Sequence, residues 1–216
     1  MEINKFIDHT ILKATATEDD ILELCKEARE YSFFSVCVNS CYVPLAKKNL
    51  EGSDVKVCAV VGFPLGAMST EAKVFETEQA LKDGAEEIDM VINIGELKSK
   101  NYKKVEEEIA AIKSAVGDRV LKVIIETCYL TPQEITLASE LAVKAKADFV
   151  KTSTGFGTDG ARMENIEVMK KAVNGQAKIK ASGGIKNLDT ALSYIEAGVA
   201  RIGTSSGVSI VKELKK

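Results

Sequence analysis

The sequence has few of the residues on which metal and imidazole chemistry depend. Its 216 residues include a single histidine, His9, which excludes sites built from two imidazoles. The five cysteines are an odd number without a CxxC pair, so neither a disulfide framework nor a zinc knuckle is expected. We therefore expect no metal site, and chemistry from Lys, Asp, Glu, Ser, Thr or Cys.

The chain also lacks a strong charge of one sign and a long apolar run. With a formal net charge of −3, the chain has no positive electrostatic potential of the kind that attracts nucleic acid or an anionic membrane. No apolar run is long enough to span a bilayer, and the first residues, MEINKFIDHTILK, interleave charges with apolar side chains, unlike a signal peptide. These absences predict a cytoplasmic protein with a small-molecule partner, and no nucleic-acid or membrane partner.

What the sequence does have is a regular alternation of apolar runs of strand length with longer segments of helical period. The runs that we interpret as strands are KFIDHT, FSVCVNS, VKVCAVVGFP, EIDMVINIG, LKVIIETCYL, DFVKTSTG, KIKASGG and ARIGTSS. Strands rich in Val and Ile, separated by helices, are typical of a parallel sheet buried on both faces. About eight such units in a chain of this length predict an α/β fold, a (β/α)8 TIM barrel.

A doubly wound open sheet is the alternative, but it usually has fewer strands at this length. No Pro/Gly/Ser-rich linker divides the chain, so a single domain over residues 1–216 is expected.

Helix boundaries recur along the chain. Thr131-Pro132-Gln133-Glu134 has the pattern of a capped helix start. The stretch KVEEEI at 104–109 indicates a solvated helix face. Glycines are expected to close other helical segments, at Gly52, Gly84, Gly117 and Gly198.

Barrel enzymes place their chemistry at the carboxyl ends of the strands, and three polar side chains near such ends stand out. The period of two in EIDMVINIG turns Asp89 toward the barrel interior, with Val91 and Asn93 on the same face. A carboxylate there is either satisfied by neighbouring hydrogen bonds or functional, and the apolar residues around Asp89 favour a functional role.

Two lysines share a face of the strand KIKASGG. Lys178 lies near its beginning and is expected to be solvated, while Lys180 lies near its catalytic end. If this strand neighbours the one that carries Lys151, Lys151 and Lys180 can approach each other. Repulsion and desolvation would lower the pKa of at least one of the two, leaving a neutral amine that condenses with a carbonyl. We therefore predict a Schiff base on Lys151; the alternative is that either lysine pairs with a carboxylate or extends outward.

Glycine-containing loops follow the last three predicted strands, where barrels often bind phosphate through backbone N–H groups. Such motifs also make ordinary turns, but three in succession indicate an anion site. The expected phosphate-binding residues are Thr154, Gly155, Gly183, Gly184, Ser205 and Ser206.

Further polar residues near strand ends allow more than one interpretation. Asp8 and His9 either line the pocket or make structural hydrogen bonds, and Lys122 is a candidate inward partner of Asp89. Cys37 fits a small core residue better than a nucleophile. Asp8, Cys37 and Lys122 are expected to line the pocket, and Glu126 also lies near a predicted strand end.

The motifs IDHT, EIDMVINIG, LKVIIET, FVKTSTGFG, KASGGIK and IGTSSG occur in this order along nearly the whole chain. Together they resemble the deoxyribose-phosphate aldolase family, class I aldolases of the (β/α)8 fold. The resemblance implies reversible cleavage of 2-deoxy-D-ribose 5-phosphate into D-glyceraldehyde 3-phosphate and acetaldehyde, without a metal or organic cofactor. It also implies a homo-oligomer, a dimer or tetramer.

The resemblance implies roles for three residues. Lys151 would carry the Schiff base, Asp89 would donate and accept protons, and Lys180 would exchange protons as the neighbouring cation that perturbs Lys151. Some relatives carry a lysine shortly after TSTG where this chain has Phe156, so phosphate binding would depend on backbone amides, Ser205 and Ser206. The chain also ends in KELKK instead of the tyrosine of some members.

Two other functions would use the same glycine loops. One is another phosphate-binding barrel enzyme, an isomerase or synthase acting on a sugar phosphate. The other is a non-catalytic barrel that binds a phosphorylated metabolite. Imine formation on Lys151 distinguishes the aldolase from both.

Overall fold

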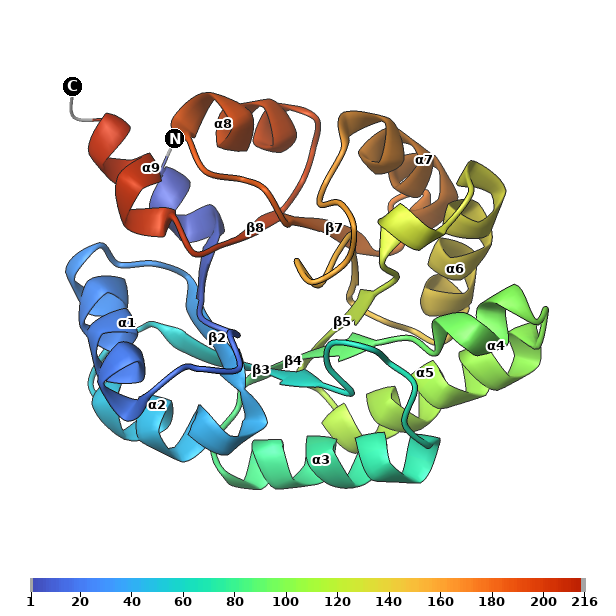
Figure 1. Cartoon of the computed structure of the whole chain (residues 1–216), viewed down its shortest axis with the longest axis horizontal. Coiled ribbons are helices and arrows are strands. Elements are labelled where there is room, and N and C mark those ends of the chain that lie inside the picture. Colours follow the sequence, from blue (N-terminus) through green and yellow to red (C-terminus); the bar gives the residue numbers. More distant parts are fainter. Residues whose placement is uncertain (1, 215–216) are drawn as a thin grey trace.

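The computed structural model describes residues 2–214, and eight parallel strands form a closed barrel in chain order (Figure 1). The predicted (β/α)8 barrel is confirmed, and the doubly wound alternative is wrong because β1 pairs with both β2 and β8. The strands are β1 (Ile7–Thr10), β2 (Ser35–Asn39), β3 (Lys56–Val61), β4 (Glu87–Val91), β5 (Val120–Ile124), β6 (Phe149–Lys151), β7 (Lys178–Ser182) and β8 (Arg201–Thr204).

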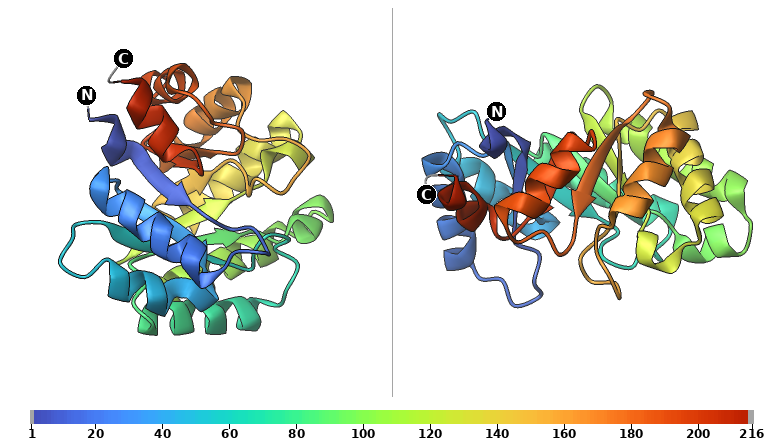
Figure 2. Two further views of the ribbon diagram at one scale, coloured as in Figure 1. Left: turned by 60° about the vertical axis from the view of Figure 1, so that its left-hand side comes forward. Right: turned by 90° about the horizontal axis from the view of Figure 1, so that it is seen from above.

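The helices surround the barrel on its outside, as the views in Figure 1 and Figure 2 show. They cover the outward-facing strand residues, such as Ile88 and Met90, which are fully buried. The α-helices are α1 (Glu18–Glu30), α2 (Val43–Asn49), α3 (Thr70–Lys82), α4 (Ile94–Lys98), α5 (Tyr102–Val116), α6 (Pro132–Lys144), α7 (Met163–Val173), α8 (Leu188–Glu196) and α9 (Gly207–Glu213). The short 3-10 helices are η1 (Ile3–Phe6), η2 (Ser40–Tyr42) and η3 (Thr127–Tyr129).

Local sequence signals set several helix ends as expected. Thr131 caps α6 with a complete capping box to Glu134, and Pro132 is the first helical residue. Gly117 ends α5 with φ near +63°, a conformation that glycine adopts without steric cost.

Two local predictions are wrong. The first expected strand, KFIDHT, starts only at Ile7, because residues 3–6 form η1. The KVEEEI stretch is not uniformly solvated, because Glu108 is buried and pairs with the buried Lys73 at 2.9 Å. A charged side chain on an apolar helix face is tolerated there because a partner from α3 compensates it.

The two ends of the described chain lie side by side, since α9 contacts both η1 and β1 (Figure 2). Within residues 2–214, none of the helices combines the length and the apolar character needed to cross a membrane.

Candidate active site

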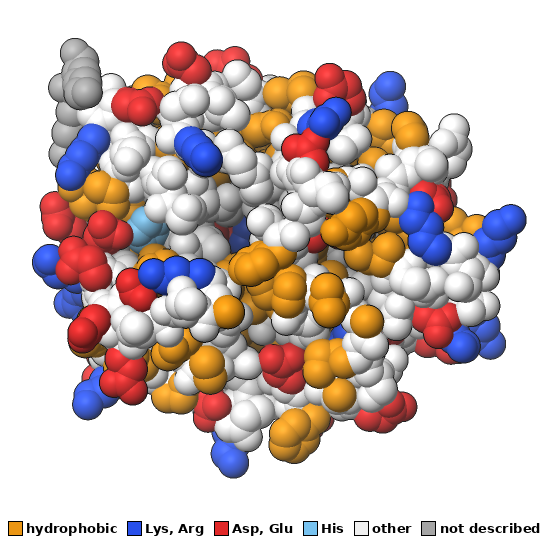
Figure 3. Space-filling view, in the orientation of Figure 1, with side chains coloured by type: hydrophobic (Ala, Val, Ile, Leu, Met, Phe, Trp, Pro, Cys, Tyr) orange, Lys and Arg blue, Asp and Glu red, His pale blue; other side chains and the backbone are white. Residues whose placement is uncertain are grey.

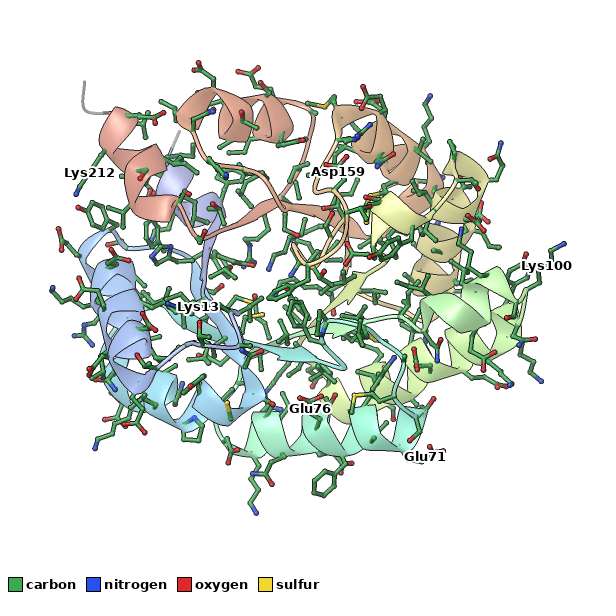
Figure 4. All side chains as sticks on the ribbon, viewed as in Figure 1. Lys13, Glu71, Glu76, Lys100, Asp159 and Lys212 are labelled. Atoms are coloured by element: carbon green, nitrogen blue, oxygen red, sulfur yellow. The ribbon has the colours of Figure 1, made fainter. Side chains whose placement is uncertain are left out.

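A cavity of about 360 Å³ opens at the carboxyl end of the barrel. Figure 3 shows a hollow near the middle of this face, with a blue side chain deep inside it and hydrophobic side chains beside it. Figure 4 labels Lys13 and Asp159, which belong to the segments after β1 and β6 and lie on two sides of the barrel centre. The cavity is lined by Thr10, Ile11, Leu12, Lys13, Lys151, Thr154, Gly155, Phe156, 182–186 and 203–206.

Lys151 lies at the end of β6. Its side chain lines the cavity and also contacts Asp89 in the barrel interior. Its side chain is 3% exposed, and Nζ donates to Asp89 Oδ2 at 2.8 Å. An amine that lines a cavity while bonded to a buried carboxylate is suited to exchange a proton and to react with a bound carbonyl.

Asp89, on β4, receives hydrogen bonds from three lysines of three different strands. Oδ2 accepts from Lys151 and Lys180, and Oδ1 accepts from Lys122, all at 2.8 Å. Burial alone would raise the pKa of this carboxyl, but the lysines outweigh burial and hold the pKa well below its usual range. Asp89 is therefore an ionised carboxylate at neutral pH.

Lys180 lies directly opposite Lys151 across the β6–β7 pair. Burial would lower its pKa, but Asp8 and Asp89 together raise the pKa above the ordinary value. Lys180 is therefore a charged neighbour, and Lys151 and Lys180 both bond one oxygen of Asp89. A lowered pKa is not found at Lys180, whereas the alternative expected from the sequence, pairing with a carboxylate, is confirmed for both lysines.

The structure corrects the expected position of the three pocket-lining residues. Asp8, Cys37 and Lys122 do not line the cavity but are fully buried in the barrel interior beneath it. Two of these side chains make polar contacts there. Asp8 accepts a hydrogen bond from Ser35 at 2.7 Å, and Lys122 forms an ion pair with Glu87 at 2.6 Å. The expected pairing of Lys122 with Asp89 is confirmed.

Strand pairing also creates a cluster that sequence spacing does not reveal. Cys37 and Cys58 lie directly opposite each other on β2 and β3, and their sulfurs lie within 4.8 Å of each other and of an Asp89 oxygen. This is a three-ligand group where none was expected. Asp89 already compensates three ammonium groups, however, so a divalent cation would have to compete with them.

The three glycine loops converge on the cavity, as the order of the strands requires. Gly155, Gly183 and Gly184 have φ values of +87°, +87° and +80°, which L side chains adopt only with strain. Thr154, Ser205 and Ser206 complete the polar wall. Phe156, next to Gly155, also lines the cavity, and its ring packs edge-to-face against Phe63 with centroids 5.4 Å apart.

Two residues are placed outside the site. His9 is 3% exposed, bonds Glu27 at 2.7 Å and packs on Phe33, so its role is structural. Lys178 is exposed at the start of β7, as expected.

Arg201 and Glu87 are interior residues that sequence analysis missed. Arg201 Nη1 bonds Asp8 Oδ1 at 2.7 Å and Glu87 Oε2 at 3.2 Å. Glu87 is the first residue of β4, two residues before Asp89, so the inward periodicity of that strand could have indicated it. Arg201 is the first residue of β8 and lies directly opposite Lys180 on β7, a pairing that sequence spacing alone does not reveal.

Comparison with known proteins gives consistent matches over the whole chain. The family model described as DeoC/LacD family aldolase matches residues 3–213. A deoxyribose-phosphate aldolase from Finegoldia magna is 59% identical over 212 residues, covering 98% of this chain and 100% of that protein. One from Clostridium tetani is 56% identical over 216 residues, covering all of both chains.

Solved structures agree with these sequence matches. The tetrameric deoxyribose phosphate aldolase from Aeropyrum pernix superposes with a TM-score of 0.90 at 32% identity, covering 99% of this chain and 91% of that one. The fold and the sequence identity agree over nearly the whole chain. This chain belongs to the DeoC/LacD family of aldolases.

Proposed function

We propose that this protein is a class I deoxyribose-phosphate aldolase. It catalyses the reversible cleavage of 2-deoxy-D-ribose 5-phosphate into D-glyceraldehyde 3-phosphate and acetaldehyde. The observation that supports this best is Lys151, a cavity-lining amine bonded at 2.8 Å to an ionised carboxylate that also holds a charged lysine.

The reaction begins at Lys151. Its ammonium loses a proton, and the neutral amine adds to C1 of the open-chain sugar; loss of water then gives a protonated imine. The C3 hydroxyl loses its proton, the C2–C3 bond breaks, and its electrons move into the imine to form an enamine. Protonation of the enamine at C2 and hydrolysis release acetaldehyde and free the Lys151 amine.

Asp89 and Lys180 are suited to the proton transfers in this sequence. Asp89 Oδ2 accepts hydrogen bonds from both lysines, so a proton that leaves Lys151 has an acceptor within hydrogen-bond reach. Since Asp89 is fully buried below the cavity, protons reach the sugar hydroxyl through Lys151 or through water.

The phosphate binds on the polar wall of the cavity. Gly155, Gly184 and Ser205 come from three loops around one opening, and backbone N–H groups of such loops stabilise anions. Phe156 supplies no charge, so this wall depends on the amides, the serine hydroxyls and the nearby Lys186.

The same proposal extends to assembly and location. The tetrameric relative supports a homo-oligomer, either a dimer or a tetramer. The phosphorylated substrate supports a cytoplasmic location. Both stay predictions.

Trapping of the imine tests the proposed function. Incubation with acetaldehyde and borohydride is expected to add an ethyl group to Lys151, because reduction makes the imine permanent. Peptide mapping by mass spectrometry identifies the modified residue, and Lys178, an exposed lysine on the neighbouring strand, is the internal control.

An adduct on Lys180 or Lys178 would overturn the assignment of the nucleophile. A protein that forms no adduct and does not turn over deoxyribose 5-phosphate would instead be an isomerase, a synthase or a non-catalytic binding barrel.

A further inference from the structure

Glu126 is a buried carboxylate that the reaction above does not use. It lies two residues beyond the end of β5, and its side chain is 2% exposed. Its backbone has φ near +52°, a left-handed conformation that is strained for a residue with a long side chain. Strain of this kind persists only where surrounding contacts hold it.

The contacts of Glu126 go to the loop that follows β6. Oε1 and Oε2 accept from the Thr154 N–H at 3.1 and 3.2 Å, and Oε2 also accepts from the Thr154 hydroxyl. The Thr154 hydroxyl oxygen in turn accepts from the Phe156 N–H at 3.0 Å. Glu126 thereby fixes the residues on both sides of Gly155.

Packing supports the same conclusion independently. A Cβ on Gly157 would lie 2.6 Å from Cys128 Sγ and 3.2 Å from Glu126 Cδ, so the loop lies directly on the Glu126 side chain. Figure 1 shows this loop curling over the centre of the barrel.

Burial of the Glu126 carboxylate is costly in free energy. Burial raises the pKa of Glu126, which the Thr154 bonds and the charge of Lys151 oppose without fully offsetting. A carboxylate beside a loop that binds phosphate would also repel the ligand. The hydrogen bonds of the Glu126 side chain all go to Thr154, so the contribution that we assign to Glu126 is to hold the loop.

We infer that Glu126 is a positioning residue for phosphate recognition, which acts through Thr154 to hold Gly155 in its cavity-lining conformation. Because the N–H and hydroxyl of Thr154 are both committed to Glu126, Thr154 orients the loop instead of contacting the phosphate itself. The inference rests on the proposed function, since it concerns the phosphate of that substrate.

The test compares Glu126→Gln with Glu140→Gln, a matched change on the exposed face of α6. Glu126→Gln places an amide donor against the donors of Thr154, so KM for deoxyribose 5-phosphate is expected to rise about tenfold. The inhibition constant of inorganic phosphate should rise by a similar factor. The kcat on this substrate, and kcat/KM for unphosphorylated deoxyribose, should stay within about twofold. Glu140→Gln should change none of these quantities.

A second pair of variants covers the case in which Glu126→Gln does not fold. Thr154→Val removes the hydroxyl that links Glu126 to the Phe156 N–H, and Thr154→Ser restores it. The valine variant should show the same selective rise in KM, and serine should reverse it. The combination of Glu126→Gln and Thr154→Val should be no worse than the stronger single change, because both break one connection.

Equal losses on both sugars, or unchanged phosphate inhibition, would overturn the role of Glu126. Borohydride trapping with acetaldehyde separates this outcome from failure of the proposed function, because acetaldehyde carries no phosphate. Wild-type protein that forms no adduct on Lys151 would refute the aldolase itself, whereas a normal adduct with no phosphate-selective effect would refute only the positioning role.

Discussion

At the scale of single residues, the site depends on how one carboxylate compensates three lysines. Asp89 accepts from Lys122, Lys151 and Lys180, so removal of any cation changes the electrostatic environment of the other two. Lys151 differs from the others because it alone also lines the cavity.

Lys180→Leu is expected to move the pH profile of imine trapping on Lys151 upward. Without Lys180, Asp89 Oδ2 interacts with Lys151 alone, so its negative charge opposes the loss of a proton from Lys151 more strongly. The measurement is borohydride trapping of acetaldehyde across pH, by mass spectrometry.

Lys178→Leu is the matched control, since Lys178 lies on the same strand but is exposed at the opposite end of the barrel. Its trapping profile should be that of the wild type. A wild-type profile in Lys180→Leu would remove the proposed coupling between the two lysines.

At the scale of elements, local sequence accounts well for helix starts and for the direction of strand side chains. The Thr131–Glu134 capping box and the inward orientation of Asp89 are both confirmed, because they depend on residues close in sequence. The prediction of a solvated face is wrong at Glu108, because its partner Lys73 comes from another helix.

Thr131→Ala should lower the free energy of unfolding by about 1 kcal/mol, because the first turn of α6 loses a hydrogen-bond acceptor. The site should be unaffected, since Thr131 is exposed and does not line the cavity. Urea unfolding followed by circular dichroism measures the change, and Thr131→Ser should retain most of the stability. If alanine and serine have equal effects, the capping box contributes little to stability.

At the scale of the whole molecule, a network of buried charges in the barrel interior connects strands far apart in the sequence. Arg201 on β8 joins Asp8 on β1 to Glu87 on β4, and its guanidinium stacks on Phe34 at 3.4 Å. Such a network stabilises the fold only while every member keeps its partner.

Arg201→Met should reduce the free energy of unfolding by about 3–5 kcal/mol, because Asp8 and Glu87 would stay buried without their shared cation. The midpoint of urea unfolding at neutral pH measures the loss. Arg119→Met, at an exposed position, should have little effect, and equally small changes in both variants would contradict the role of the network.

Acid should weaken the same network. Burial would raise the pKa of Asp8, but Lys180 and Arg201 outweigh burial and lower its pKa, and the lysines lower the pKa of Asp89. The unfolded chain therefore binds more protons than the folded one below about pH 4, and stability falls as the pH falls through that range. Arg201→Met should show a shallower fall in unfolding free energy between pH 4 and 2, and an equally steep fall would contradict this linkage.

The sequence by itself determined the alternation of strands and helices, the (β/α)8 class, and Lys151, Asp89 and Lys180 as the residues of interest. These follow from local periodicity, strand order and motif resemblance, which need no contact between distant segments. Only the tertiary structure decided that Asp8, Cys37 and Lys122 lie below the cavity, that Arg201 joins Asp8 to Glu87, and that Glu126 holds Thr154. Those features depend on which side chains meet across the barrel, and the closure and register of the strands set these meetings in three dimensions.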